Sequence, residues 1–336
     1  MTMKIASIHA ICGQITRCLL PVTAMVGLTL ATSGAQAKSY SIGMVTPPGH
    51  IWSQVSDRMS NNLKLASHDQ IRLRSSRMAK MQGEAETIKK LQSGKLHLAI
   101  LTAGSLSSLE PAFSGWYLPY LFKDVQAVAK ATAGTDAQQM LQRLESSQLV
   151  GMGYALAGMR QVVSTRPVAN VSDFNGMKIR SFPDQVFKDW WQTLNAVPMQ
   201  LALLDTQPAL LNKQLDAVDV DLDMLVGLKI YRDAPYLTVT NHMAFPGVVV
   251  ASKVWWDGLT VDRQQMVMTA FKEAEAWGFQ RQEEAEINNL ALLKREGVKV
   301  ANLGAEQMSA AISTVIKRYT AANPVIKHFY EQYHPR

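Results

Sequence analysis

"GEAETIKKLQSGKLHLAIL" occupies residues 83–101 and contains one complete helix-to-strand unit. Ile88 and Leu91 recur at helical spacing, and Gly94 is the residue at which such a helix ends in a left-handed turn. The largely apolar run at 95–101 is typical of a buried strand. Helices that alternate with buried strands predict an α/β fold with mostly parallel sheets.

The same unit occurs a second time, in "TQPALLNKQLDAVDVDL" at 206–222. When the two segments are laid over each other, Leu91 matches Leu210 and Leu96 matches Leu215. The identity is too low to establish a duplication. Two lobes of similar construction are nevertheless the natural interpretation.

The segments before the first unit follow the order strand, helix, strand. Residues 39–47 form the first expected strand, 50–67 carry apolar residues at helical spacing, and 70–77 alternate between apolar and polar residues. Short connections in this order imply parallel strands with right-handed crossovers.

The rest of the chain alternates in the same way. We expect strands at 149–156, 177–182 and 246–256, and helices at 183–196, 260–297 and 305–330. The helix at 260–297, which Thr260 or Asp262 caps and Gly297 stops, is long enough to brace two lobes. We therefore divide the chain into a leader at 1–37, a first lobe at 38–157 with a return segment at about 246–260, a second lobe at 158–245, and helices at 260–336.

Residues 1–37 have the features of a cleaved secretory signal. Lys4 and Arg17 are their only charges, an apolar run covers 18–31, and "AQA" precedes Lys38. The run is shorter than the roughly 20 residues that cross a bilayer. We therefore predict an exported product that begins near Lys38 and is not itself embedded in the membrane.

Composition limits the classes of partner. Cys12 and Cys18 both lie in the leader, so the mature chain has no disulfide and depends on its hydrophobic core. The formal charge of +7 falls by two once the leader is removed, and no run of Lys and Arg is present. This argues against a nucleic-acid partner.

The motifs of common enzyme and cofactor sites are missing from the sequence. There is no CxxC, HExxH, G-x-S-x-G, Walker A loop or G-x-G-x-x-G after the first strand, and the seven histidines never pair at i, i+4. We therefore expect a non-enzyme with no cofactor and no metal. An exported enzyme that acts on a carboxylate substrate, with Asp205, Asp219 or His242 as acid or base, is the alternative.

The segment "GMKIRSF" (176–182) poses the question of what Arg180 does. Alternation along a strand sends Lys178, Arg180 and Phe182 to one face, and Pro183 ends the strand at the rim of the sheet. Ligand sites of α/β proteins gather at such rims. Arg180 is thus either a ligand-binding cation or a solvated charge on an edge strand.

The acidic segment "DAVDVDLD" (216–223) leaves three alternatives open. It lacks the Gly and Glu positions of an EF-hand calcium loop, so its four Asp side chains bind a cation, face a ligand, or serve as caps and rim charges. His50 and Trp52 follow a Pro-Pro-Gly turn, where they either reach a cleft or cap a helix. The pair Trp190 and Trp191 is more typical of core packing than of an aromatic box.

Five segments in order resemble the DctP-type substrate-binding proteins of tripartite ATP-independent periplasmic (TRAP) transporters. They are "MQGEAETIKKLQSGKLHLAI" (81–100), "YLPYLFKD" (117–124), "GMRQVVSTRPVANVSDFNGMKIRSFP" (158–183), "ALLNKQLDAVD" (209–219) and "TNHMAFPGVVVASKVWW" (240–256). The resemblance implies a two-lobed periplasmic-binding-protein-like fold with a ligand cleft between the lobes. It also implies a periplasmic receptor that delivers a small carboxylate-bearing solute to the small and large TRAP membrane subunits; service to a signalling receptor is an alternative.

The resemblance also assigns roles to individual residues. The arginine that grips the substrate carboxylate falls on Arg180, and an assisting arginine falls on Arg160. A guanidinium suits this task because its planar fork forms two parallel hydrogen bonds with a carboxylate. A cleft for a small organic acid also needs apolar surfaces, for which Phe182 and Phe245 are the candidates, and His50 is a further candidate for contact with the solute.

The sequence departs from the family pattern in the acidic segment. A polar Asn of the family falls on Val220, and a Gly falls on Ala217, while Asp219 adds negative charge. This favours a zwitterion whose ammonium meets Asp219, or an acid bound together with a cation, over a simple dicarboxylate. Cleft closure is expected from hinge bending near Gly158 and Pro246.

Overall fold

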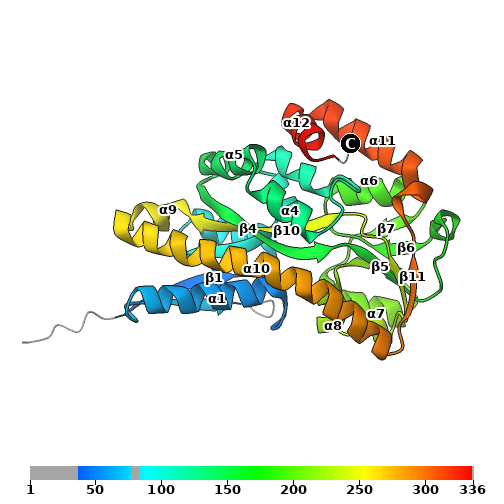
Figure 1. The fold of residues 1–336 in the computed structure, drawn as a ribbon, viewed down its shortest axis with the longest axis horizontal. Coiled ribbons are helices and arrows are strands. Elements are labelled where there is room, and N and C mark those ends of the chain that lie inside the picture. Colours follow the sequence, from blue (N-terminus) through cyan, green and yellow to red (C-terminus); the bar gives the residue numbers. More distant parts are fainter. Residues whose placement is uncertain (1–36, 77–82, 335–336) are drawn as a thin grey trace, which may run out of the picture. The chain divides into compact units, whose positions relative to one another are not determined.

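The computed structural model describes residues 37–76 and 83–334 (Figure 1). The predicted secretory leader lies outside these residues, apart from its last position. The described chain contains two sheets covered by helices, which confirms the predicted two-lobed α/β fold.

The first sheet consists, in spatial order, of β2 (Ile71–Ser76), β1 (Lys38–Gly43), β3 (Leu98–Thr102), β10 (Ala244–Ser252) and β4 (Leu149–Met159). The helices of this lobe are α1 (Ile51–Ala66), α2 (Glu84–Gln92), α3 (Ala103–Ser107), α4 (Val125–Thr132), α5 (Thr135–Arg143) and α9 (Lys253–Asp257). The spatial position of β10 shows that the chain returns to the first sheet late.

The second sheet consists of β11 (Lys299–Asn302), β9 (Tyr236–Val239), β5 (Gln161–Ser164), β8 (Ala217–Val220), β6 (Lys178–Arg180) and β7 (Val197–Met199). Its helices are α6 (Gln185–Thr193), α7 (Thr206–Leu211) and α8 (Leu222–Gly227). Both sheets are mixed, because β10 and β5 run antiparallel to their neighbours while the remaining pairs are parallel.

The long helix α10 (Val261–Arg295) spans both lobes, as predicted. It packs on α1 and β4 of the first lobe and on α8 of the second. Close approach to α1 requires Gly278, because a Cβ there would lie 2.6 Å from the Val55 side chain. A helix that contacts both lobes in this way limits how they can move.

Two predicted elements differ from the structure. The strand expected at 246–256 ends at Ser252, whose hydroxyl accepts from the Trp255 amide and starts α9. The single helix expected at 305–330 is divided into α11 (Ser309–Ala322) and α12 (Pro324–Tyr333), because Asn323 leaves helical geometry and caps the second helix.

The lobes are connected where β4 passes into β5 and where β9 passes into β10. At these crossings the Arg160 amide donates to the Met243 carbonyl (2.8 Å), and the His242 amide donates to the Arg160 carbonyl (3.3 Å). The two crossing segments therefore support each other. They place Arg160 at the boundary between the lobes.

Candidate functional site

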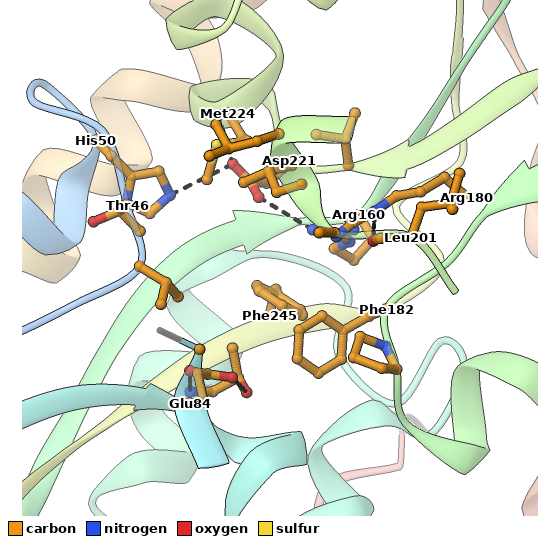
Figure 2. A pocket seen from close by; sticks show the side chains of 18 of the residues that line it. Thr46, His50, Glu84, Arg160, Arg180, Phe182, Leu201, Asp221, Met224 and Phe245 are labelled. Atoms are coloured by element: carbon orange, nitrogen blue, oxygen red, sulfur yellow. Dashed lines mark hydrogen bonds and ion pairs between the residues drawn. The ribbon is translucent and has the colours of Figure 1, made fainter. Parts of the chain in front are cut away.

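A cavity of about 540 Å³ is lined by residues of both lobes (Figure 2). The first lobe contributes the start of α1 and the start of α2. The second contributes the end of β6, the segment 200–204 and the start of α8. Of the six site residues predicted from the sequence, all but Asp219 line this cavity: His50, Arg160, Arg180, Phe182 and Phe245.

Arg180 lies at the end of β6, which is an interior strand between β8 and β7. Its side chain is only 7% exposed, and its Nε donates to the Leu201 carbonyl at 3.3 Å. Within the described chain Arg180 forms no ion pair with a carboxylate. Burial, together with repulsion by Arg160, lowers its pKa to about 10. The alternative of a solvated charge on an edge strand is therefore wrong for Arg180, whereas Lys178 on the same interior strand is exposed to solvent.

Arg160 is held rigidly by two aspartates. Its Nε donates to Asp219 Oδ1 at 2.7 Å, its Nη1 to Asp221 Oδ2 at 3.1 Å, and its Nη2 to the Asp219 carbonyl. The guanidinium carbon lies 4.3 Å from the centroid of the Phe245 ring. Figure 2 shows this guanidinium beside that of Arg180. One N–H of each terminal nitrogen of Arg160 is left over for a ligand.

Asp219 was predicted to contact the solute, but it lies behind Arg160 and not at the cavity wall. It is fully buried, and its Oδ2 accepts from Trp191 Nε1 (2.9 Å) and faces His242 Nε2 (3.4 Å). Burial opposes ionisation, but Arg160 and His242 hold the pKa of Asp219 well below its usual range. Its carboxylate orients Arg160 and has no exposed face for the ammonium of a zwitterion.

Asp221, two residues further, is the carboxylate of the described 216–223 segment that lines the cavity. It caps α8 by accepting from the Met224 amide (2.8 Å), and its Oδ1 lies 3.7 Å from His50 Nε2. Burial opposes its ionisation, but His50 and Arg160 keep its pKa below the usual value. Sequence reasoning named Asp221 only as a member of the acidic cluster; its place directly after β8 is the signal that identifies it.

The other acidic side chains of the 216–223 segment bind protein donors. Asp216 accepts from the Lys178 amide, and Asp223 accepts from the Ile51 amide and the Asn289 side chain. In the part of the chain that the structure describes, no group of three or more His, Cys, Asp and Glu side chains has the arrangement of a metal site.

Aromatic rings form the floor of the cavity. Trp52 stacks on Phe245, with ring planes 1° apart and centroids separated by 6.2 Å, and Phe182 meets Phe245 edge to face at 5.2 Å. Tyr117 packs on Phe245 from within the core. Trp190 and Trp191 are fully buried, in agreement with the core-packing interpretation.

Two features of the wall were missed by sequence reasoning. Glu84 starts α2, and its two oxygens accept from the amide (2.7 Å) and the hydroxyl (2.6 Å) of Thr102, while burial raises its pKa. The segment 200–204 contributes Leu201 and Leu204 from the short connection before α7, which contains a 3₁₀ turn at Leu203–Asp205. No periodicity marks such a connection, so the sequence offered no signal for it.

The residues of the enzyme alternative are not gathered at the cavity. His242 is buried, with Nδ1 2.8 Å from the Thr240 hydroxyl and its ring stacked on Trp190, and Asp205 is exposed. Neither is among the described residues that line the cavity.

Comparison with known proteins identifies relatives of the whole described fold. The family model "DctP: Bacterial extracellular solute-binding protein, family 7" matches residues 42–328. The C4-dicarboxylate-binding protein DctB of Bacillus subtilis (strain 168) is 27% identical over 198 residues, which is 59% of this chain and 57% of that protein.

Solved structures show the same fold. A TRAP periplasmic solute-binding protein of Haemophilus influenzae with bound L-gulonate has a TM-score of 0.83 at 19% identity, covering 88% of this chain and 98% of that one. Its counterpart from Xanthobacter autotrophicus Py2 with bound β-D-galacturonate has a TM-score of 0.82 at 22% identity, covering 87% and 98%.

None of the helices in the described residues has both the length and the apolar character needed to cross a membrane. The resemblance noted from the sequence is confirmed by the family match, which extends over most of the chain. The chain belongs to the DctP family, the bacterial extracellular solute-binding proteins of family 7.

Proposed function

We propose that this chain is a periplasmic receptor that binds a small carboxylate-bearing solute and delivers it to TRAP-type membrane subunits. The observation that carries the proposal is the buried Arg180 guanidinium at the wall of a cavity between two lobes, without a carboxylate partner in the described chain. A solute carboxylate supplies that partner. Membership of the DctP family supports the transport role, and the leader at 1–37 supports export with cleavage before Lys38.

Binding proceeds by charge neutralisation followed by enclosure. The carboxylate meets the terminal nitrogens of Arg180 and the remaining N–H groups of Arg160, both of which aim at the cavity. Asp219 and Asp221 already hold Arg160 in place, so this side chain loses little conformational entropy when the solute binds. Closure of the lobes, by hinge bending near Gly158 and Pro246, then removes water from the pair.

Arg180→Ala tests the proposal directly. Loss of one partner from a buried charge pair costs about 3–5 kcal/mol, or roughly two to four decades in affinity. We expect that loss in calorimetric titrations of the exported chain with its preferred carboxylate.

Lys178→Ala is the matched control, because Lys178 lies on the same strand but is exposed. It should change the affinity by less than about 1 kcal/mol. Affinity within threefold of the wild type in a folded Arg180→Ala variant would contradict the proposal.

A further inference from the structure

Among the residues that the structure describes, the cavity wall offers one place for an anion and not two. Arg160 faces the carboxylates of both Asp219 and Asp221, so its charge is already neutralised by the protein. Arg180 has only the Leu201 carbonyl as a described partner. The one guanidinium of this wall with no carboxylate partner in the described chain is therefore that of Arg180.

The remaining charged groups of the described wall are negative. Asp221 lies next to Arg160, and Glu84 lies across Phe245 from the two arginines, as Figure 2 shows. A second carboxylate on the solute would approach one of these two groups. Such like-charge contacts in a cavity of low polarity are strongly unfavourable.

Many hydrogen-bonding groups of the described wall are already paired with other protein groups. The Thr46 hydroxyl pairs with Ser53 (3.1 Å), and the Thr102 hydroxyl pairs with Glu84. His50 Nδ1 accepts from the Trp52 amide, and its Nε2 faces Asp221. Gln200 and the free N–H groups of the two arginines are the polar partners left in the described wall, and a carboxylate takes the arginine groups. A solute with many hydroxyl groups would therefore lose more hydrogen bonds to water than it regains here.

Most other described parts of the wall are hydrocarbon. Side chains from β10, β8, α1, α8 and the 200–204 segment surround the space next to the arginines: Phe245, Val220, Trp52, Met224, Leu201 and Leu204. Leu204 is 64% exposed and lines the cavity, so its side chain presents apolar surface there. An apolar solute body covers such a surface and is stabilised by it.

We infer that the solute is a monocarboxylate with an apolar body, held by its carboxylate at Arg180 and by its hydrocarbon against Trp52, Phe245 and Leu204. This inference rests on the proposed function, which it narrows to a substrate class. It separates this chain from a C4-dicarboxylate receptor and from a receptor for polyhydroxylated sugar acids. The carboxylate and the apolar wall act together, so neither charge alone nor hydrocarbon alone suffices.

Four probes distinguish the possibilities in calorimetric titrations of the exported chain: 3-phenylpropionate, 4-methylpentanoate, succinate and D-galacturonate. We expect at least one of the first two to bind ten or more times more tightly than either of the others. A smaller difference, or a preference for succinate or galacturonate, overturns the inference but leaves the carboxylate receptor intact. If none of the four binds, the proposed function fails and the inference fails with it.

Leu204→Ser and Leu211→Ser form a matched pair that tests the apolar wall. Both leucines are exposed and lie seven residues apart in the sequence, so both variants should fold, but of the two only Leu204 lines the cavity. We expect Leu204→Ser to weaken the better apolar acid about three- to tenfold and Leu211→Ser to leave it unchanged. Equal affinities in the two variants would overturn the assignment of the wall.

Discussion

Arg180 is a residue that the protein retains at a cost to its own stability. A buried guanidinium whose described partner is a single carbonyl has lost water without gaining an opposite charge. Its pKa of about 10 lies below the ordinary 12.5, so its charged form is disfavoured in the folded protein. A buried charge that lowers stability in this way is expected where ligand binding depends on it.

Arg180→Met should therefore raise the unfolding temperature of the solute-free protein while it abolishes binding. The folded pKa lies below the unfolded one, so the cost is fully present at neutral pH and fades only as pH rises through about 10. We expect a gain on the order of 1–3 kcal/mol in the free energy of unfolding, measured by calorimetry at pH 7.

Lys178→Met is the control, because removal of this exposed charge should change the free energy of unfolding by less than about 0.5 kcal/mol. A destabilised Arg180→Met protein would show that the arginine contributes to the fold and would remove this interpretation.

At the scale of the element, α10 is fastened to β4 by a carboxyl group. Glu286 Oε1 accepts from the Met159 amide (3.1 Å) and from Gln282 Nε2 (3.2 Å). Gly158 has a φ of +98°, and a Cβ there would collide with the Glu286 carboxylate, so glycine is required. This contact lies beside the crossing from β4 to β5.

Burial, with added repulsion from Asp221 and Asp223, raises the pKa of Glu286 to about 7. The folded state then binds more protons than the unfolded state between about pH 4.5 and pH 7, so this group makes the protein less stable as pH rises through that window. Glu286→Gln keeps the acceptor for Met159 and removes the ionisation.

We expect Glu286→Gln to raise the unfolding temperature at pH 8 and to leave it unchanged at pH 4.5. Thermal melts across this range provide the measurement, and Glu273→Gln, an exposed position on the same helix, should follow the wild type throughout. A pH profile of Glu286→Gln parallel to that of the wild type would contradict the assignment.

Several elements were predictable from sequence because their signals are local. α1, α2 and α10 follow apolar periodicity, and Gly94 ends the turn after α2 as expected. Arg160 and Arg180 were found because both lie beside strand ends within a segment that resembles the family.

Other parts depend on packing that local patterns do not encode. Asp219 and Asp221 lie two residues apart, yet β8 ends between them, so one is buried behind Arg160 and the other caps α8 at the cavity. The exact end of a strand decides that difference. Leu201 and Leu204 come from a short connection with one 3₁₀ turn, and its position depends on the packing of the elements around it and not on its own propensity.

At the scale of the whole molecule, the lobes meet through the start of α1. The Ile51 amide donates to Asp223 Oδ2 at 3.1 Å, and Asp223 also accepts from Asn289 of α10. His50 lies 3.7 Å from Asp221 next to this contact. The dipole of α1 favours the carboxylate at its N-terminus. Asp223 thus joins the first lobe, the second lobe and the bracing helix.

Asp223→Ala should shift the molecule toward a more open arrangement. Loss of a hydrogen-bonded acceptor at a buried contact costs about 1–3 kcal/mol, so we expect solute to dissociate about tenfold faster. Stopped-flow kinetics measure the rate, and small-angle scattering should report a larger radius of gyration without solute.

Asp262→Ala removes an exposed carboxylate from the first turn of α10 and serves as the control. Unchanged dissociation and unchanged dimensions in the Asp223→Ala protein would show that the contact does not hold the lobes together.

The position of β10 has a consequence for how the chain folds. This strand lies between β3 and β4, so the first sheet has a gap until residues 244–252 have been made. A nascent chain that ends before residue 244 leaves the facing edges of β3 and β4 without partners. The first sheet can therefore be completed only after nearly all of the second lobe has been synthesised. This order favours late, cooperative folding of the two lobes. A chain that is slow to complete its first sheet also leaves these edges open for longer to pairing with other extended segments.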